Sequence, residues 1–194
     1  MLIKKKRTLF SLALVLILAA AAYYYFAIYH SVRDISLAGS YEWHPTSQAL
    51  FSGADLVVVG SPIKDFEDRE VLSKETSTGI LMYIATSTEI KVEKVLKGPK
   101  EDAVDLNVIE PVGLKQTFKG KERITIEGYT AMKRGSQYLI FLSKNTFGQY
   151  GVINMQAGKF NLDGTDPNEL SGEESHNKQR IFTEITTEFS NELK

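Results

Sequence analysis

The chain has 194 residues, with 23 Lys and Arg against 24 Asp and Glu, and it contains no cysteine. The absence of cysteine excludes a disulfide framework, a thiol nucleophile and thiolate metal ligands. Residues 31–194 carry 19 Lys and Arg against 24 Asp and Glu, and this net charge of −5 has the wrong sign for a nucleic-acid-binding protein.

The first predicted element is a transmembrane helix. Residues 1–7 form a basic tail that ends in Lys4-Lys5-Lys6-Arg7, and residues 8–29 are almost entirely apolar. About 20 apolar residues, rising about 1.5 Å each, cross a hydrocarbon core of about 30 Å. We therefore expect a single-pass signal-anchor helix in the cell membrane. The basic tail should be cytoplasmic and the chain after residue 30 extracytoplasmic, with Tyr23–Tyr29 at the outer interface.

Two fates of this segment remain open. Cleavage after Ala22 would use the small residues Ala19–Ala22, as in a secreted protein. A cleaved signal peptide, however, has an apolar core of only about 7–15 residues. The apolar run continues to Tyr29, so its length favours a retained anchor.

A β-rich domain is predicted over residues 47–170, after a juxtamembrane linker at residues 30–46 that shows no clean hydrophobic period. Continuous apolar runs at Leu56–Val59 and Tyr138–Leu142 predict strands buried on both faces. The other expected elements are a short helix capped by Thr46 or Ser47, an exposed loop over Lys64–Thr78, a long strand over 80–96, half-buried strands at 104–108 and 124–126, and a closing hairpin of 150–153 with 159–162.

The last predicted element is an amphipathic helix over residues 171–194. Ser171 and Glu174 have the spacing of a capping box, and Ile181, Ile185 and Phe189 recur every four residues. Many short strands with few helices predict a mainly β fold. We expect a small OB-like closed barrel with a C-terminal helix, because closure removes exposed strand edges.

Four segments in this order resemble a known family. They are Ala54–Gly60, Glu89–Gly98, Lys133–Leu142 and Gln156–Phe160. Together they resemble bacterial extracytoplasmic proteins with the netrin-like, tissue-inhibitor-of-metalloproteinase-type OB barrel, over residues 50–163. The resemblance implies the fold. Animal inhibitors of this type chelate a catalytic zinc through an N-terminal cysteine, which this chain lacks, so their mechanism does not carry over.

The residues offer little support for catalysis or metal binding. Type I signal peptidases place their serine in a Ser-Met-x-Pro setting after the anchor, and neither Ser31 nor Ser40 has that setting. His30, His44 and His176 lack metal-ligand spacing. For Asp163–Glu169 an Asx-type turn is favoured over a calcium site. No catalytic, cofactor-binding or metal-binding residue is therefore predicted, and no cofactor is expected.

The function expected from these observations is a non-enzymatic, membrane-anchored, extracytoplasmic binding module. Its partners would be the membrane, through residues 8–29, and an unknown envelope protein or ligand. OB-type barrels bind through one face and the loops beside it, so Lys64–Gly79 and Pro111–Glu122 are the first places to look. The alternatives are an envelope enzyme or enzyme inhibitor, and a structural or immunity-type surface protein.

Overall fold

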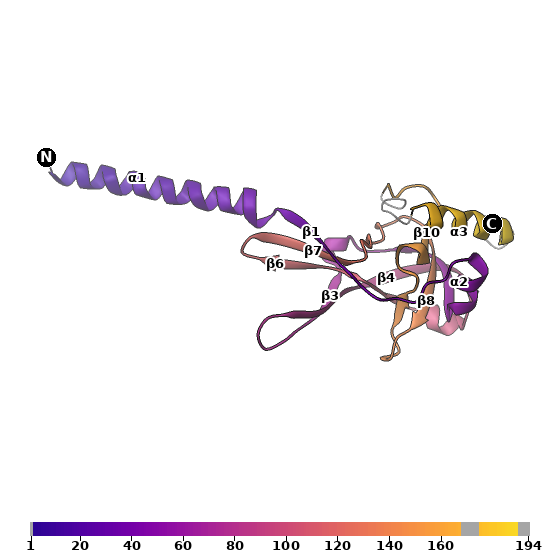
Figure 1. Ribbon diagram of the computed structural model, residues 1–194. Coiled ribbons are helices and arrows are strands. Elements are labelled where there is room, and N and C mark those ends of the chain that lie inside the picture. The colour runs from indigo at the N-terminus through magenta and orange to yellow at the C-terminus, as the bar shows by residue number, and fades with distance from the viewer. Residues whose placement is uncertain (1, 168–174, 190–194) are drawn as a thin grey trace. The chain divides into compact units, whose positions relative to one another are not determined.

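The computed structural model describes residues 2–167 and 175–189 (Figure 1). The chain divides into two compact units. One contains Met1–Ile35 and Leu114–Arg123, and the other contains Ser36–Gly113 and Ile124–Lys194. Each unit is described by itself below.

The first unit contains the N-terminal apolar helix. Helix α1 (Leu2–Tyr23) continues as a π-helix, η1 (Tyr24–Tyr29). The 20 residues Phe10–Tyr29 form a helix that is long and apolar enough to cross a membrane. The predicted N-terminal helix is therefore confirmed, and it could anchor the protein in a membrane.

The segment expected as a linker contains a strand. Strand β1 (Val32–Leu37) lies in a three-stranded sheet of order β1-β7-β6. Almost all of its residues are exposed, so no alternation of apolar and polar residues marks it in the sequence. Pairing with β7 (Gly120–Ile126), rather than burial, defines this strand.

The remaining elements alternate strands with short helical turns. The strands and α-helices among them are α2 (Ser47–Gly53), β2 (Leu56–Pro62), β3 (Glu70–Glu75), β4 (Leu81–Lys97), β5 (Asn107–Glu110), β6 (Val112–Thr117), β8 (Tyr138–Lys144), β9 (Tyr150–Val152), β10 (Lys159–Asn161) and α3 (Ser175–Glu188). Single 3₁₀ turns lie at η2 (Phe66–Asp68), η3 (Lys100–Ala103) and η4 (Met155–Gly158).

Five strands of the second unit close into a barrel. Around the ring, β8 pairs with β2, β2 with β4, β4 with β5, β5 with β9, and β9 with β8. Only the junction of β5 with β9 is parallel, where Val108 lies beside Tyr150. The predicted mainly β fold with a small closed barrel is thus confirmed, and the barrel has the five strands of an OB-fold.

Strands β2 and β8 are buried on both faces, as predicted. Val58 and Ile140 point into the barrel and join one core cluster. Their neighbours Val57 and Phe141 point outwards into a second cluster, which also contains residues of α2 and α3. Each strand therefore lies between two apolar layers, which explains its unbroken apolar sequence.

Both predicted helices of the domain pack on this outer layer. Thr46 caps α2, and its side chain accepts a hydrogen bond from the Ala49 N–H at 3.2 Å, as predicted. Ile181 and Ile185 of α3 are fully buried in the outer cluster. The proposed Ser171–Glu174 capping pair lies outside the described residues.

Two predictions of strands and loops are wrong. The Lys64–Thr78 segment is not a loop, because it contains η2 and β3, and β3 pairs antiparallel with β4. The predicted strand at 104–108 begins only at Asn107, and Val104 is 69% exposed. The sequence does not predict β3, because an exposed edge strand with charged residues at both ends has no buried face to give it an apolar pattern.

The predicted closing hairpin is also wrong. Strands β9 and β10 do not pair with each other; both pair with β8, β9 near Leu142 and β10 near Ile140. Turn η4 separates them. It begins after Asn154, and the φ angles of Asn154 and Met155 are 56° and 49°. Two successive left-handed residues redirect the chain, and sequence periodicity does not reveal them.

Candidate functional site

A buried ion pair is the first polar feature of the barrel. Glu110 lies on the same inward face of β5 as Val108, two residues earlier, and its side chain is 0% exposed. One carboxylate oxygen accepts from Arg69 at 2.8 Å and from the Thr88 hydroxyl. The other accepts from the Tyr129 hydroxyl at 2.9 Å and from the Met132 N–H at 2.8 Å.

Arg69 is bonded as fully as its partner. Its Nε donates to the Lys64 carbonyl at 3.0 Å, and a terminal nitrogen donates to the Met132 carbonyl at 2.6 Å. The pair joins β4, β5 and the segments around residues 64–69 and 129–132. Because the oxygens and nitrogens of the pair are already bonded within the protein, the geometry indicates a structural role.

A second titratable cluster joins η3 to the ends of β8 and β9. The Lys144 ammonium and the Tyr150 hydroxyl each donate to Asp102 at 2.7 Å. The bond from Lys144 is the main cause that lowers the pKa of Asp102, and Asp102 in turn raises the pKa of Lys144. Burial, followed by the bond to Asp102, raises the pKa of Tyr150. Each shift moves a pKa away from 7, whereas a general acid or base works best with a pKa near the operating pH.

The three histidines are divided between the two units. His30 lies against the rings of Tyr25 and Tyr29 in the first unit. In the second unit, the backbone of His44 is bonded on both sides by the Asn154 amide, and His176 is exposed near the start of α3. Within residues 2–167 and 175–189, no group of three or more His, Asp or Glu residues could hold a metal ion.

The Asp163 carboxylate is used by the turn itself. It accepts hydrogen bonds from Asn161 at 2.8 Å, from the Thr165 N–H at 3.0 Å and from the Gln137 N–H at 2.9 Å. The bond from the Thr165 N–H, two residues further on, is that of an Asx-type turn. Glu169, the last residue of the segment considered for calcium, lies outside the described part of the chain.

The Asp163 turn makes stability depend on acid pH. Burial raises the pKa of Asp163, but hydrogen bonds from Thr165, Gln137 and Asn161 outweigh it and lower the pKa from 3.8 to about 2. A carboxyl with a lowered folded-state pKa stabilises the fold above its unfolded pKa, and this contribution is lost as the pH falls from about 4 to about 2. Since Asp163 is exposed, screening keeps the contribution near or below about 1 kcal/mol.

We therefore expect Asp163→Asn to lower stability slightly at pH 7 and to approach the parent protein near pH 2. Chemical unfolding of both proteins across this range measures the difference. Two pH profiles that run parallel would show that the Asp163 pKa is not linked to folding.

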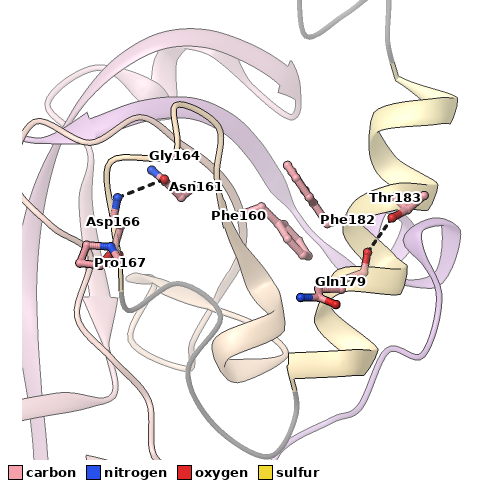
Figure 2. A pocket seen from close by; sticks show the side chains of 8 residues that line it. All are labelled: Phe160, Asn161, Gly164, Asp166, Pro167, Gln179, Phe182 and Thr183. Carbon is pink, nitrogen blue, oxygen red and sulfur yellow. Dashed lines mark hydrogen bonds between the residues drawn. The ribbon is translucent and has the colours of Figure 1, made fainter.

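A groove of the second unit lies between β10, the turn at 163–167 and α3 (Figure 2). Its volume is about 440 Å³, within the usual range for ligand sites. Figure 2 shows the rings of Phe160 and Phe182 between the turn and the helix, and they stack with centroids 5.6 Å apart. Phe160 is buried and Phe182 is half-buried, so the groove has an aromatic wall that opens to solvent.

A few polar groups border this aromatic wall. Asn161 accepts a hydrogen bond from the Asp166 N–H at 3.2 Å, and the Asp166 carboxylate accepts from the Tyr138 hydroxyl at 2.6 Å. On the helix side, the Thr183 hydroxyl donates to the backbone carbonyl of Gln179 at 2.9 Å. The amide side chain of Gln179 lies on the rim of the groove. The arrangement suits an apolar group that is held by stacking and shape, with amide and hydroxyl groups around it.

The sequence does not predict this groove. It predicts Phe160 only as part of a strand, and Phe182 only as a flank of the apolar stripe of the helix. The available signal is Phe182 itself, because it widens the stripe beyond the four-residue repeat of Ile181, Ile185 and Phe189. Neither Lys64–Gly79 nor Pro111–Glu122 lines the groove. As binding segments, these two remain predictions.

The chain matches no protein-family model, and no curated protein is significantly similar to it. The class of protein is defined by the structure: it is a mainly β protein with a closed five-strand barrel, a docked C-terminal helix and an N-terminal apolar helix that could span a membrane. The netrin-like resemblance stays a prediction.

Proposed function

We propose that the protein is a membrane-anchored, non-enzymatic binding module that holds an apolar group of its ligand in the groove beside α3. The observation that carries the proposal is the stacked pair Phe160 and Phe182, which lines a groove of about 440 Å³ on the second unit. Aromatic walls with a few polar groups are typical of binding sites. Binding is favoured over catalysis because the polar groups Asn161 and Asp166 are bonded to other groups of the protein.

The proposal includes the location of the domain. Lys4–Arg7 precede the apolar helix, and by the positive-inside rule they should remain in the cytoplasm. The barrel would then face the outside of a single-pass protein in the cell membrane, as in the bacterial netrin-like proteins that the sequence resembles. The ligand would be an envelope protein or another molecule at that surface.

One labelling experiment tests both the location and the groove. Because the chain has no cysteine, Gln179→Cys on the groove rim provides a unique thiol for a membrane-impermeant maleimide that carries a photo-crosslinker. We expect intact cells to be labelled, and illumination to link the domain to a distinct product. Labelling only after cell lysis would reject the extracytoplasmic location.

A matched pair of variants tests the groove itself. Thr183→Trp places an indole inside the groove and should reduce the crosslinked product several-fold. Thr187→Trp is the control, because Thr187 is an exposed threonine of the same helix that does not line the groove. An equal yield of product in both variants would reject the groove as the binding site.

A further inference from the structure

The first unit brings a β-hairpin tip to the end of the apolar helix. The apolar stretch ends at Tyr29, and Tyr24 lies five residues earlier in the π-helix. A rise of about 1.5 Å per residue or less places Tyr24 within about 8 Å of the end of the stretch. In a helix that spans a bilayer, this is the interfacial layer, where tyrosine rings are enriched.

The tip of the β6–β7 hairpin, Thr117–Gly120, is bonded to this part of the helix. The Tyr24 hydroxyl donates to the Phe118 carbonyl at 3.0 Å. The Gln116 side chain, just before the tip, donates to the Tyr29 carbonyl at 3.2 Å. Because the Tyr24 hydroxyl reaches the backbone of Phe118 directly, the hairpin tip lies at the depth of the aromatic residues and not above them.

Two further contacts fix the same arrangement. The Lys121 N–H donates to the Ser31 carbonyl at 2.7 Å. Gly120 has a φ of +110°, and a Cβ added to it would lie 2.7 Å from the Ile28 carbonyl oxygen. The glycine therefore permits a backbone approach that other residues would block. The hairpin is therefore held against this part of the chain by main-chain contacts as well as by the side chains of Tyr24 and Gln116.

The side chains at the tip have the chemistry of a membrane interface. Phe118 is 75% exposed, and the Lys119 ammonium lies 5.6 Å from its ring centroid. Lys115 and Lys121 add positive charge to the hairpin, whereas Glu122 is paired with Arg33. The exposed phenyl ring is poorly solvated by water, whereas a layer that contains both acyl chains and phosphates suits the ring and the cations beside it. The excess of acidic residues in the external chain as a whole does not alter this local charge.

We infer that the hairpin tip Thr117–Gly120 is a second membrane contact. Phe118 enters the interfacial layer of the leaflet from which the helix emerges, and Lys119 meets the lipid phosphates. This inference rests on the membrane anchor of the proposed function. It extends the membrane contact, expected from residues 8–29 alone, to a segment almost ninety residues further along the chain.

Fluorescent labelling of the full chain in vesicles of phosphatidylcholine and phosphatidylglycerol tests the inference. Phe118→Cys is labelled with an environment-sensitive nitrobenzoxadiazole dye, and a lipid with a spin label near its headgroup serves as quencher. Phe147→Cys is the control, because Phe147 is a phenylalanine of the second unit with a similar exposed fraction, 85%. We expect the dye at residue 118 to emit at shorter wavelength than the dye at 147, and to lose about half of its intensity to the quencher.

A third label separates this inference from the anchor itself. Leu16→Cys places the dye inside the apolar stretch. If the dye at residue 16 is protected from an aqueous quencher but the dye at 118 behaves like the dye at 147, the hairpin contact is overturned and the anchor stands. If the dye at 16 is also exposed to water, the anchor fails, and the hairpin contact fails with it.

Discussion

Val58→Asp is expected to leave the barrel unfolded. Val58 is fully buried and lies directly opposite Ile140, which is also fully buried and points into the same core cluster. A carboxylate at this position would have no partner among the surrounding apolar side chains. Burying an unpaired charge costs several kcal/mol, a large part of the roughly 5–15 kcal/mol that stabilises a typical domain.

The measurement is the near-ultraviolet circular dichroism of the purified chain, which reports packed aromatic side chains. Val104→Asp is the matched control, because it makes the same chemical change at a side chain that is 69% exposed. The control should change stability by less than about 0.5 kcal/mol. A folded Val58→Asp protein would mean that β2 does not line the barrel interior.

Arg69→Ala is expected to lower the free energy of unfolding by about 3–5 kcal/mol. The substitution leaves the Glu110 carboxylate buried, with hydrogen bonds from Thr88, Tyr129 and Met132 but without its cation. It also removes the donors to the Lys64 and Met132 carbonyls. Urea unfolding of the full chain measures the loss.

Two comparisons isolate the effect of burial in this pair. Arg134→Ala removes an arginine whose ion pair with Asp65 is exposed, and it should cost less than about 1 kcal/mol. The double variant Arg69→Met with Glu110→Leu removes both charges, and it should be more stable than Arg69→Ala alone. A double variant that is less stable than Arg69→Ala would show that the Glu110 carboxylate stabilises the fold even without its cation, through its remaining hydrogen bonds.

The parts of the fold that the sequence predicts are those with a strong local pattern. Strands β2 and β8 can be predicted because every position faces an apolar layer. Helix α3 can be predicted because its apolar residues recur every four positions. The cap of α2 can be predicted because one threonine side chain is sufficient to form it. In each case the structure follows from residues that are close together in the chain.

The parts that the sequence does not predict depend on distant partners. Strands β1 and β3 are largely exposed and are defined by pairing with β7 and β4. The separation of β9 from β10 depends on backbone angles at Asn154. The groove exists only because α3 packs beside β10, so neither Phe160 nor Phe182 marks a site by itself.

The order of strands around the barrel determines how late the fold can form. β2 comes first in the chain among the barrel strands, yet one of its two neighbours is β8, where Leu56 pairs with Leu142. Such distant pairing requires closure of a long loop and is associated with folding in milliseconds to seconds rather than microseconds. Until residue 142 is available, β2 remains an uncovered strand that is apolar on both faces. During synthesis, the chain must therefore stay unaggregated until nearly the whole domain has been made, and a chain that ends before β8 cannot close the barrel.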